Sequence, residues 1–173
     1  AKRDGSSINL RPAFGSSNQF LYLISNRRVY AQVLQVNVEE DRLMRVVASA
    51  DREAAFESIN VLHNTLSLNA DRSRLCFTSR AGGAYVFHLW DTKRNREAIA
   101  HRLPMDFSAV FESALSPDGT RIAFAATRSN QVDLWLWAPV EGVPRRLTDD
   151  PFVEGEPAWT PDGRALAYTG NRN

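Results

Sequence analysis

The chain has 173 residues, of which 43% are hydrophobic and 24% are charged, a composition typical of a soluble globular protein. Its formal net charge is +1, which provides no long-range field to attract nucleic acid or acidic lipid, so we expect no nucleic-acid partner. No stretch reaches the length of about 18 apolar residues that a transmembrane helix needs.

The first segment, residues 10–58, contains short apolar runs separated by polar turns. The phrase RPAFGSSNQFLYLISNR (11–27) resembles a later part of the chain, and VYAQVLQVNVEEDRLMRVV (29–47) predicts two strands around a polar turn. Residues 39–59 also contain good helix formers and no proline. A strand nevertheless fits Leu43–Ala48, which leaves a helical turn at Arg52–Phe56.

The second segment, residues 59–107, contains LSLNADRSRLCFTSR (66–80) and AYVFHLWDTKRN (84–95). The unbroken apolar run YVFHLW indicates a strand that is buried on both faces. Cys76 is the only cysteine, so an intrachain disulfide is excluded, and we expect it to be a small buried hydrophobic residue. His88 falls inside a strand, which favours a packed or hydrogen-bonded histidine over a metal ligand.

The third and fourth segments, residues 108–153 and 154–173, contain nearly the same phrase twice. ALSPDGTRIAFAATR occupies 114–128 and AWTPDGRALAYTGNR occupies 158–172, a step of 44 residues. Pro-Asp-Gly is a tight turn, because proline presets φ, aspartate bonds to nearby backbone and glycine accepts a positive φ. We assign a structural role, the joining of two adjacent strands, to Pro117, Asp118, Gly119, Pro161, Asp162 and Gly163.

The earlier segments are degenerate copies of this unit. Asn69 corresponds to Ser116, a step of 47 residues, and only the aspartate of the turn survives there. In the earliest copy, residues 11–27 resemble residues 156–172, with Phe20-Leu21-Tyr22 set against Leu166-Ala167-Tyr168.

A period of 44 to 55 residues, with up to four short strands in each unit, is typical of β-propeller blades. The sequence therefore predicts an all-β fold of four-stranded antiparallel sheets, with about 3–4 blades in this chain. We expect one propeller domain over residues 1–173, with approximate blades at 10–58, 59–107, 108–153 and an incomplete 154–173.

The phrases SPDGTRIAFAATRSNQVDLWLW and RRLTDDPFVEGEPAWTPDGRALAYTGNRN resemble the PD40 or TolB-like (WD40-like) β-propeller repeats. The pattern of that family is roughly Pro-x-Trp-Ser-Pro-Asp-Gly-x-x-Ile-Ala-Phe, then Asp-Leu-Tyr, then Leu-Thr-x-Asp. Residues 111–173 match it strongly, 60–110 moderately and 10–59 weakly. The resemblance implies an exported bacterial protein that acts as a rigid platform for partners at the cell envelope.

Candidate site residues all have a structural interpretation beside a functional one. Asp133 precedes the strand LWLW, where a loop-capping role is favoured over a cation ligand. Trp135 and Trp137 share one face of that strand and are interpreted first as blade-interface residues, with a partner-contact surface as the alternative. The histidines are not at ligand spacing, and no catalytic or phosphate-binding motif is present, so we expect no cofactor, metal or catalytic site.

The function favoured by the sequence is a non-catalytic protein-interaction module, in a specific version an accessory subunit on the periplasmic face of a larger membrane complex. The alternative is the propeller domain of a longer peptidase or hydrolase whose catalytic domain lies outside this chain. A periplasmic or exported location is favoured, and a cytoplasmic one stays open. Closed propellers usually need about 4–8 blades, so we expect open blade edges covered by further chain, by a protein partner or by self-association.

Overall fold

The computed structural model describes residues 8–28, 30–49, 56–60 and 62–172. The expected helical turn at Arg52–Phe56 lies outside these residues except for Phe56, which is buried. The expected strand at Leu43–Ala48 is confirmed as part of a longer strand.

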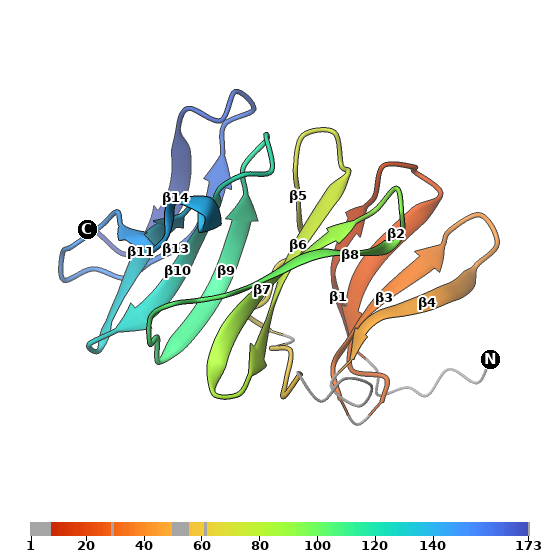
Figure 1. Ribbon diagram of the computed structural model, residues 1–173, viewed down its shortest axis with the longest axis horizontal. Helices are drawn as coiled ribbons and strands as arrows, with labels where there is room; N and C mark the ends of the chain where they lie inside the picture. The colour runs from red at the N-terminus through yellow and green to blue at the C-terminus, as the bar shows by residue number, and fades with distance from the viewer. Residues whose placement is uncertain (1–7, 29, 50–55, 61, 173) are drawn as a thin grey trace.

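The described residues form four antiparallel sheets that lie side by side in chain order (Figure 1). In each sheet consecutive strands are neighbours, so each sheet is a meander, and we call the sheets blades 1 to 4. Blade 1 comprises β1 (Asn9–Phe14), β2 (Phe20–Ser25), β3 (Gln32–Asn37) and β4 (Arg42–Ser49). Blade 2 comprises β5 (Ser67–Leu68), β6 (Arg74–Ala81), β7 (Ala84–Asp91) and β8 (Arg96–Arg102). Blade 3 comprises β9 (Ala109–Leu115), β10 (Ile122–Arg128), β11 (Gln131–Trp137) and β12 (Arg145–Arg146), and blade 4 comprises β13 (Glu154–Trp159) and β14 (Leu166–Gly170).

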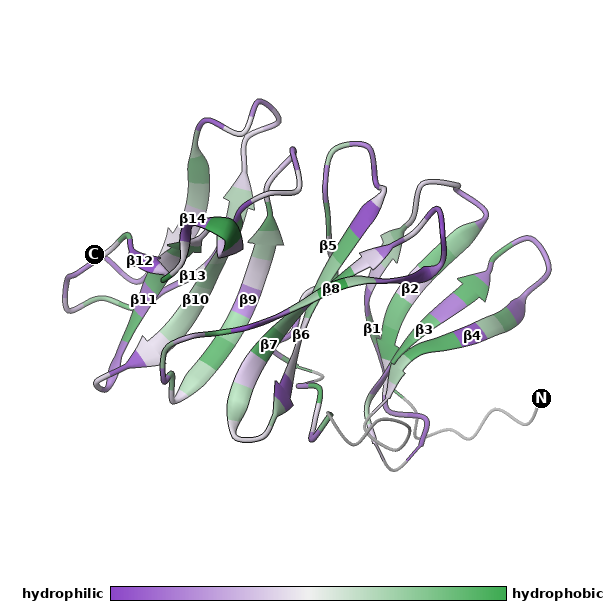
Figure 2. Cartoon of the chain, viewed as in Figure 1, coloured by the Kyte–Doolittle hydropathy of each residue, from purple (hydrophilic) through white to green (hydrophobic). Residues whose placement is uncertain are grey.

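The core lies between the blades, because the middle strands are buried on both faces. In β6, Leu75 and Phe77 pack toward blade 1, whereas Cys76 packs toward blade 3. Ile122 to Ala126 of β10 are likewise all buried. Figure 2 shows the resulting pattern of apolar strands and polar turns. The alternation of side chains explains why these strands are continuous apolar runs.

A buried polar contact joins blades 1 and 2. The amide nitrogen Nε2 of Gln35 donates to the hydroxyl of Tyr22 at 3.0 Å and to Oδ1 of Asn95 at 2.9 Å. Arg45 adds a bond from Nη1 to the backbone oxygen of Asn95 at 2.7 Å. The turn between β7 and β8 is therefore fixed to the sheet of blade 1.

The hairpins β1-β2 and β13-β14 have the same geometry, but their residues correspond in a different alignment from the one expected from the sequence. A β-bulge interrupts both β1 and β13, and the residue before the proline has positive φ in each, 56° at Arg11 and 48° at Glu156. The expected alignment of Tyr22 with Tyr168 is therefore wrong by one residue, which exchanges the two faces of a strand. The equivalent pairs are Leu21 opposite Phe14 and Leu166 opposite Trp159.

Candidate functional site

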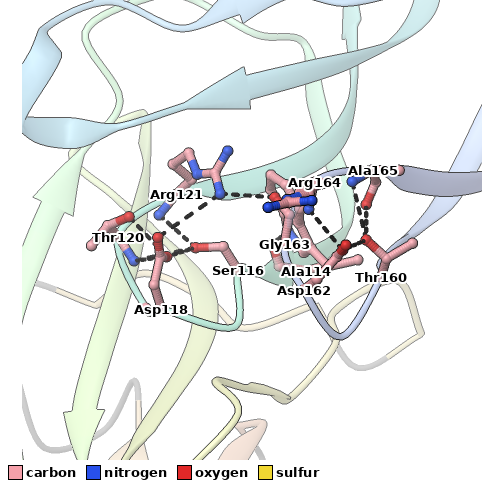
Figure 3. Close-up of polar contacts among 12 residues, drawn as sticks. Ala114, Ser116, Asp118, Thr120, Arg121, Thr160, Asp162, Gly163, Arg164 and Ala165 are labelled. Atoms are coloured by element: carbon pink, nitrogen blue, oxygen red, sulfur yellow. Dashed lines mark hydrogen bonds and ion pairs between the residues drawn. The ribbon is translucent and has the colours of Figure 1, made fainter.

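The turn between β9 and β10 is a closed network of short hydrogen bonds (Figure 3). The hydroxyl of Ser116 donates to Oδ1 of Asp118 at 2.5 Å, and the same oxygen accepts from the backbone nitrogen of Thr120 at 3.0 Å. The backbone nitrogen of Arg121 donates to the Ser116 hydroxyl at 2.9 Å. Gly119 has φ of +73°, a conformation that glycine adopts without strain. In this structure Asp118 therefore organises the turn.

The same network recurs in blades 2 and 4. In blade 4 the hydroxyl of Thr160 donates to Asp162 at 2.6 Å, and Asp162 accepts from the backbone nitrogen of Arg164 at 3.1 Å. In blade 2 the side-chain nitrogen of Asn69 donates to Asp71 at 2.9 Å. The serine, threonine or asparagine at the first position thus donates a side-chain hydrogen bond to the turn aspartate in all three turns.

Arginine side chains join the turn of blade 2 to that of blade 3, and the turn of blade 3 to that of blade 4. Nη1 of Arg74 donates to the backbone oxygen of Gly119 at 3.0 Å, and Nη2 of Arg121 donates to that of Gly163 at 3.0 Å. Arg121 also lies over the ring of Trp159, with its Cζ 4.6 Å from the ring centroid. The turns therefore fix the position of adjacent blades as well as the connection between strands.

The hydrogen bond from Ser116, with smaller contributions from Thr120 and the Arg121 charge, lowers the pKa of Asp118 to about 2. Because the unfolded pKa is about 3.9, this contribution to stability is present above about pH 4 and is lost as the pH falls toward 2. An NMR titration of the Asp118 carboxyl should show the low midpoint, and Ser116→Ala should raise it toward the ordinary value. A wild-type midpoint near 4 would contradict the bonded turn.

Asp133 is fully buried and pairs with an arginine of the outer strand. Nη2 of Arg146 donates to Oδ2 of Asp133 at 2.6 Å, while Nη1 of the same guanidinium lies 2.6 Å from Asp149. The side chain of Asp133 is 1% exposed and that of Asp149 is 82% exposed. Asp133 thus bonds across two strands of blade 3.

Trp135 and Trp137 are both buried, which corrects the alternative that they form an exposed contact surface. Trp135 packs edge-on against Phe107, and the indole nitrogen of Trp137 donates to the backbone oxygen of Gly142 at 2.5 Å. Both rings belong to the core between blades 2 and 3. The apolar face of blade 2 covers them, so they are unavailable to a partner in this structure.

A serine, a histidine and a glutamate that the sequence analysis did not connect meet in blade 2. The hydroxyl of Ser79 lies 2.7 Å from Nε2 of His88, and Nδ1 of His88 lies 2.5 Å from Oε1 of Glu97. The His88 bond lowers the pKa of Glu97. The imidazole is stacked between Phe56 and Phe77, with centroid distances of 4.5 and 4.9 Å. The two contacts connect strands β6, β7 and β8. Because Ser79 and His88 are almost completely buried, a substrate has no access to them in this structure.

Cys76 is buried in the central strand of blade 2, as expected, and burial raises the pKa of its thiol to about 12. Within the described residues no cluster of three or more His, Cys, Asp or Glu side chains is arranged to hold a metal ion. In the same part of the chain no helix has the length and apolar character needed to cross a bilayer.

The described residues form three four-stranded meander blades and a two-stranded fourth, with Pro-Asp-Gly turns between the first two strands of blades 3 and 4. This arrangement defines a β-propeller fold of the TolB-like and WD40-like kind. A crystal structure of TolB from Acinetobacter baumannii matches with a TM-score of 0.70 at 18% identity, and the match covers 94% of this chain and 37% of that chain. This likeness establishes the fold.

Sequence comparison identifies shorter similarities. The Tol-Pal system protein TolB of Anaeromyxobacter dehalogenans is 41% identical over 50 residues, which is 29% of this chain and 12% of the relative. Tricorn protease homolog 1 of Streptomyces coelicolor is 39% identical over 72 residues, 40% of this chain and 7% of the relative. No family model matches the chain. The chain thus corresponds to only a small part of the relatives it matches.

Proposed function

We propose that this chain is a non-catalytic protein-interaction module of the bacterial cell envelope. In the finer version of the proposal it is an accessory subunit, docked on the periplasmic face of a larger membrane complex. The similarity to TolB in sequence and fold supports this function. The proposal takes the four repeat units as one domain that presents its outer loops to a partner.

The surface that supports a protein contact is the loop between β11 and β12, residues 138–144, which we call the valine loop. Val140 is 90% exposed and Val143 is 69% exposed. The loop is ordered by a short 3-10 turn, Pro139–Glu141, and by the bond from Trp137 to Gly142. An exposed apolar surface that is already ordered loses little entropy on binding, which favours association.

Affinity isolation from the native source tests this proposal. The wild-type chain should recover cell-envelope proteins, and a Val140→Asp/Val143→Asp variant should lose them. Ile99→Asp on β8 is the matched control, because Ile99 is also exposed, at 47%, but lies on another blade. Cell fractionation should place the protein in the periplasm. The proposal would be contradicted if the wild-type chain recovered only cytoplasmic proteins. It would also be contradicted if the wild type, the double valine variant and Ile99→Asp all recovered the same proteins.

The second candidate is the propeller domain of a longer peptidase, which positions or admits substrate for a separate catalytic domain. The similarity to the tricorn protease homologue favours it. The complete reading frame distinguishes the two candidates. A Gly-x-Ser-x-Gly segment downstream, or a metallopeptidase segment upstream, would replace the first proposal by the second.

A further inference from the structure

A polar cavity of about 180 Å³ lies between blades 2 and 3, near the hairpin that joins β6 and β7. Strand register places Thr78 opposite Phe87 and Arg80 opposite Tyr85, so these side chains share one face of blade 2. Phe87 on that face packs against Phe124 of blade 3. The core therefore leaves an unfilled space at this end of the interface between blades 2 and 3.

The hydroxyl of Thr78, which lines this cavity, is buried without a hydrogen-bond partner in the described part of the chain. The backbone nitrogen of Thr78 donates to Oδ1 of Asn64 at 3.1 Å, and its backbone oxygen accepts from the Asn64 amide. The backbone of Thr78 is therefore satisfied, and only its side chain lacks a partner. A buried hydroxyl without a partner is costly, so this position favours a bound group that accepts a hydrogen bond from it.

Arg80 brings a positive charge to the same cavity. Among the described residues no carboxylate forms an ion pair with its guanidinium, and no Asp or Glu lines the cavity. Its Cζ lies 5.5 Å from the ring centroid of Tyr85. Asn60 also lines the cavity, and its Oδ1 already accepts two backbone bonds, which leaves its Nδ2 as a donor. The cavity thus combines one cation with several donors.

We propose that this cavity binds a carboxylate group. A single guanidinium matches one negative charge, and its planar donors fit the two oxygens of a carboxylate. The volume equals that of about six water molecules, which is below the roughly 300 Å³ of pockets for larger ligands. The bound group is therefore a small free acid or the carboxylate end of a peptide chain. This inference is independent of the proposed function.

An NMR titration of the ¹⁵N-labelled chain at constant ionic strength tests the proposal. The probes are sodium propionate and the blocked tripeptide N-acetyl-Gly-Gly-Ala, each with its neutral amide as a control. We expect saturable shifts of the Thr78, Arg80 and Tyr85 amides with an acid but with neither amide. Tighter binding of propionate assigns a free acid, whereas tighter binding of the tripeptide assigns a chain end.

Two variants connect the binding to the cavity. Arg80→Gln should weaken it at least about tenfold, and Thr78→Val should weaken it several-fold without lowering the stability of the ligand-free chain. Arg96→Gln, which changes an exposed arginine on β8 outside the cavity, should leave the affinity unchanged. The proposal is overturned if neither acid gives saturable shifts at these positions, or if Arg80→Gln binds as tightly as the wild type.

Discussion

Replacement of Phe124 by alanine should lower the free energy of unfolding by about 3–5 kcal/mol. Phe124 is completely buried at the centre of the interface between blades 2 and 3. Its ring centroid lies 5.2 Å from that of Phe87 and 5.7 Å from that of Phe107. Removal of the ring leaves a cavity that the two neighbouring sheets cannot close, because each is held by its own strand pairing.

Urea unfolding followed by tryptophan fluorescence measures this loss, since two of the four tryptophans lie in the same cluster. Phe14→Ala is the matched control, because Phe14 is 44% exposed on blade 1 and its truncation should cost only about 1 kcal/mol. If the two variants lost equal stability, the interface between blades 2 and 3 would not be the close-packed core described above.

The blade turns could be predicted from sequence because their chemistry is local. The three residues Pro-Asp-Gly are sufficient to predict a tight turn. Asp71, Asp118 and Asp162 each accept the backbone N–H hydrogen bond expected of a turn aspartate. The fold followed from the repeats of this unit, because each copy builds the same pair of strands. The aspartates of these turns therefore have a structural explanation.

The contacts between blades could not be predicted, because they depend on strand register. Ser79, His88 and Glu97 meet only when three strands are aligned, and the partner of Arg74 is a backbone oxygen 45 residues away. The burial of Trp135 likewise depends on the neighbouring blade. Alternation along one strand shows which side chains share a face, but not what covers that face.

The Thr78 cavity belongs to the same class of features. Thr78 and Arg80 stand on one face of β6 by simple alternation, which the sequence does show. The lack of a partner for the hydroxyl depends on how blade 3 packs against that face. The proposed carboxylate site thus depends on how two blades meet, and a single repeat unit does not reveal it.

Asp133→Ala should lower the free energy of unfolding by about 3 kcal/mol, whereas Asp149→Ala should change it by less than about 0.5 kcal/mol. Both carboxylates lie 2.6 Å from the guanidinium of Arg146, so the two variants compare pairs with equal distance and unequal burial. Loss of Asp133 leaves a partly buried arginine without its inner partner. Loss of Asp149 removes a pair that water already screens.

A double variant, Asp133→Val with Arg146→Met, tests whether the stability lost in Asp133→Ala comes from leaving Arg146 without its partner. An apolar pair of similar volume avoids the cost of burying two charges, so it should recover most of the stability that Asp133→Ala loses. Urea unfolding measures all three variants. Equal losses for Asp133→Ala and Asp149→Ala would show that burial does not decide the strength of this pair. A double variant as unstable as Asp133→Ala would instead assign to Asp133 a role beyond its bond to Arg146. Its second oxygen, Oδ1, is the candidate acceptor for such a role, because it is buried and has no partner among the described residues.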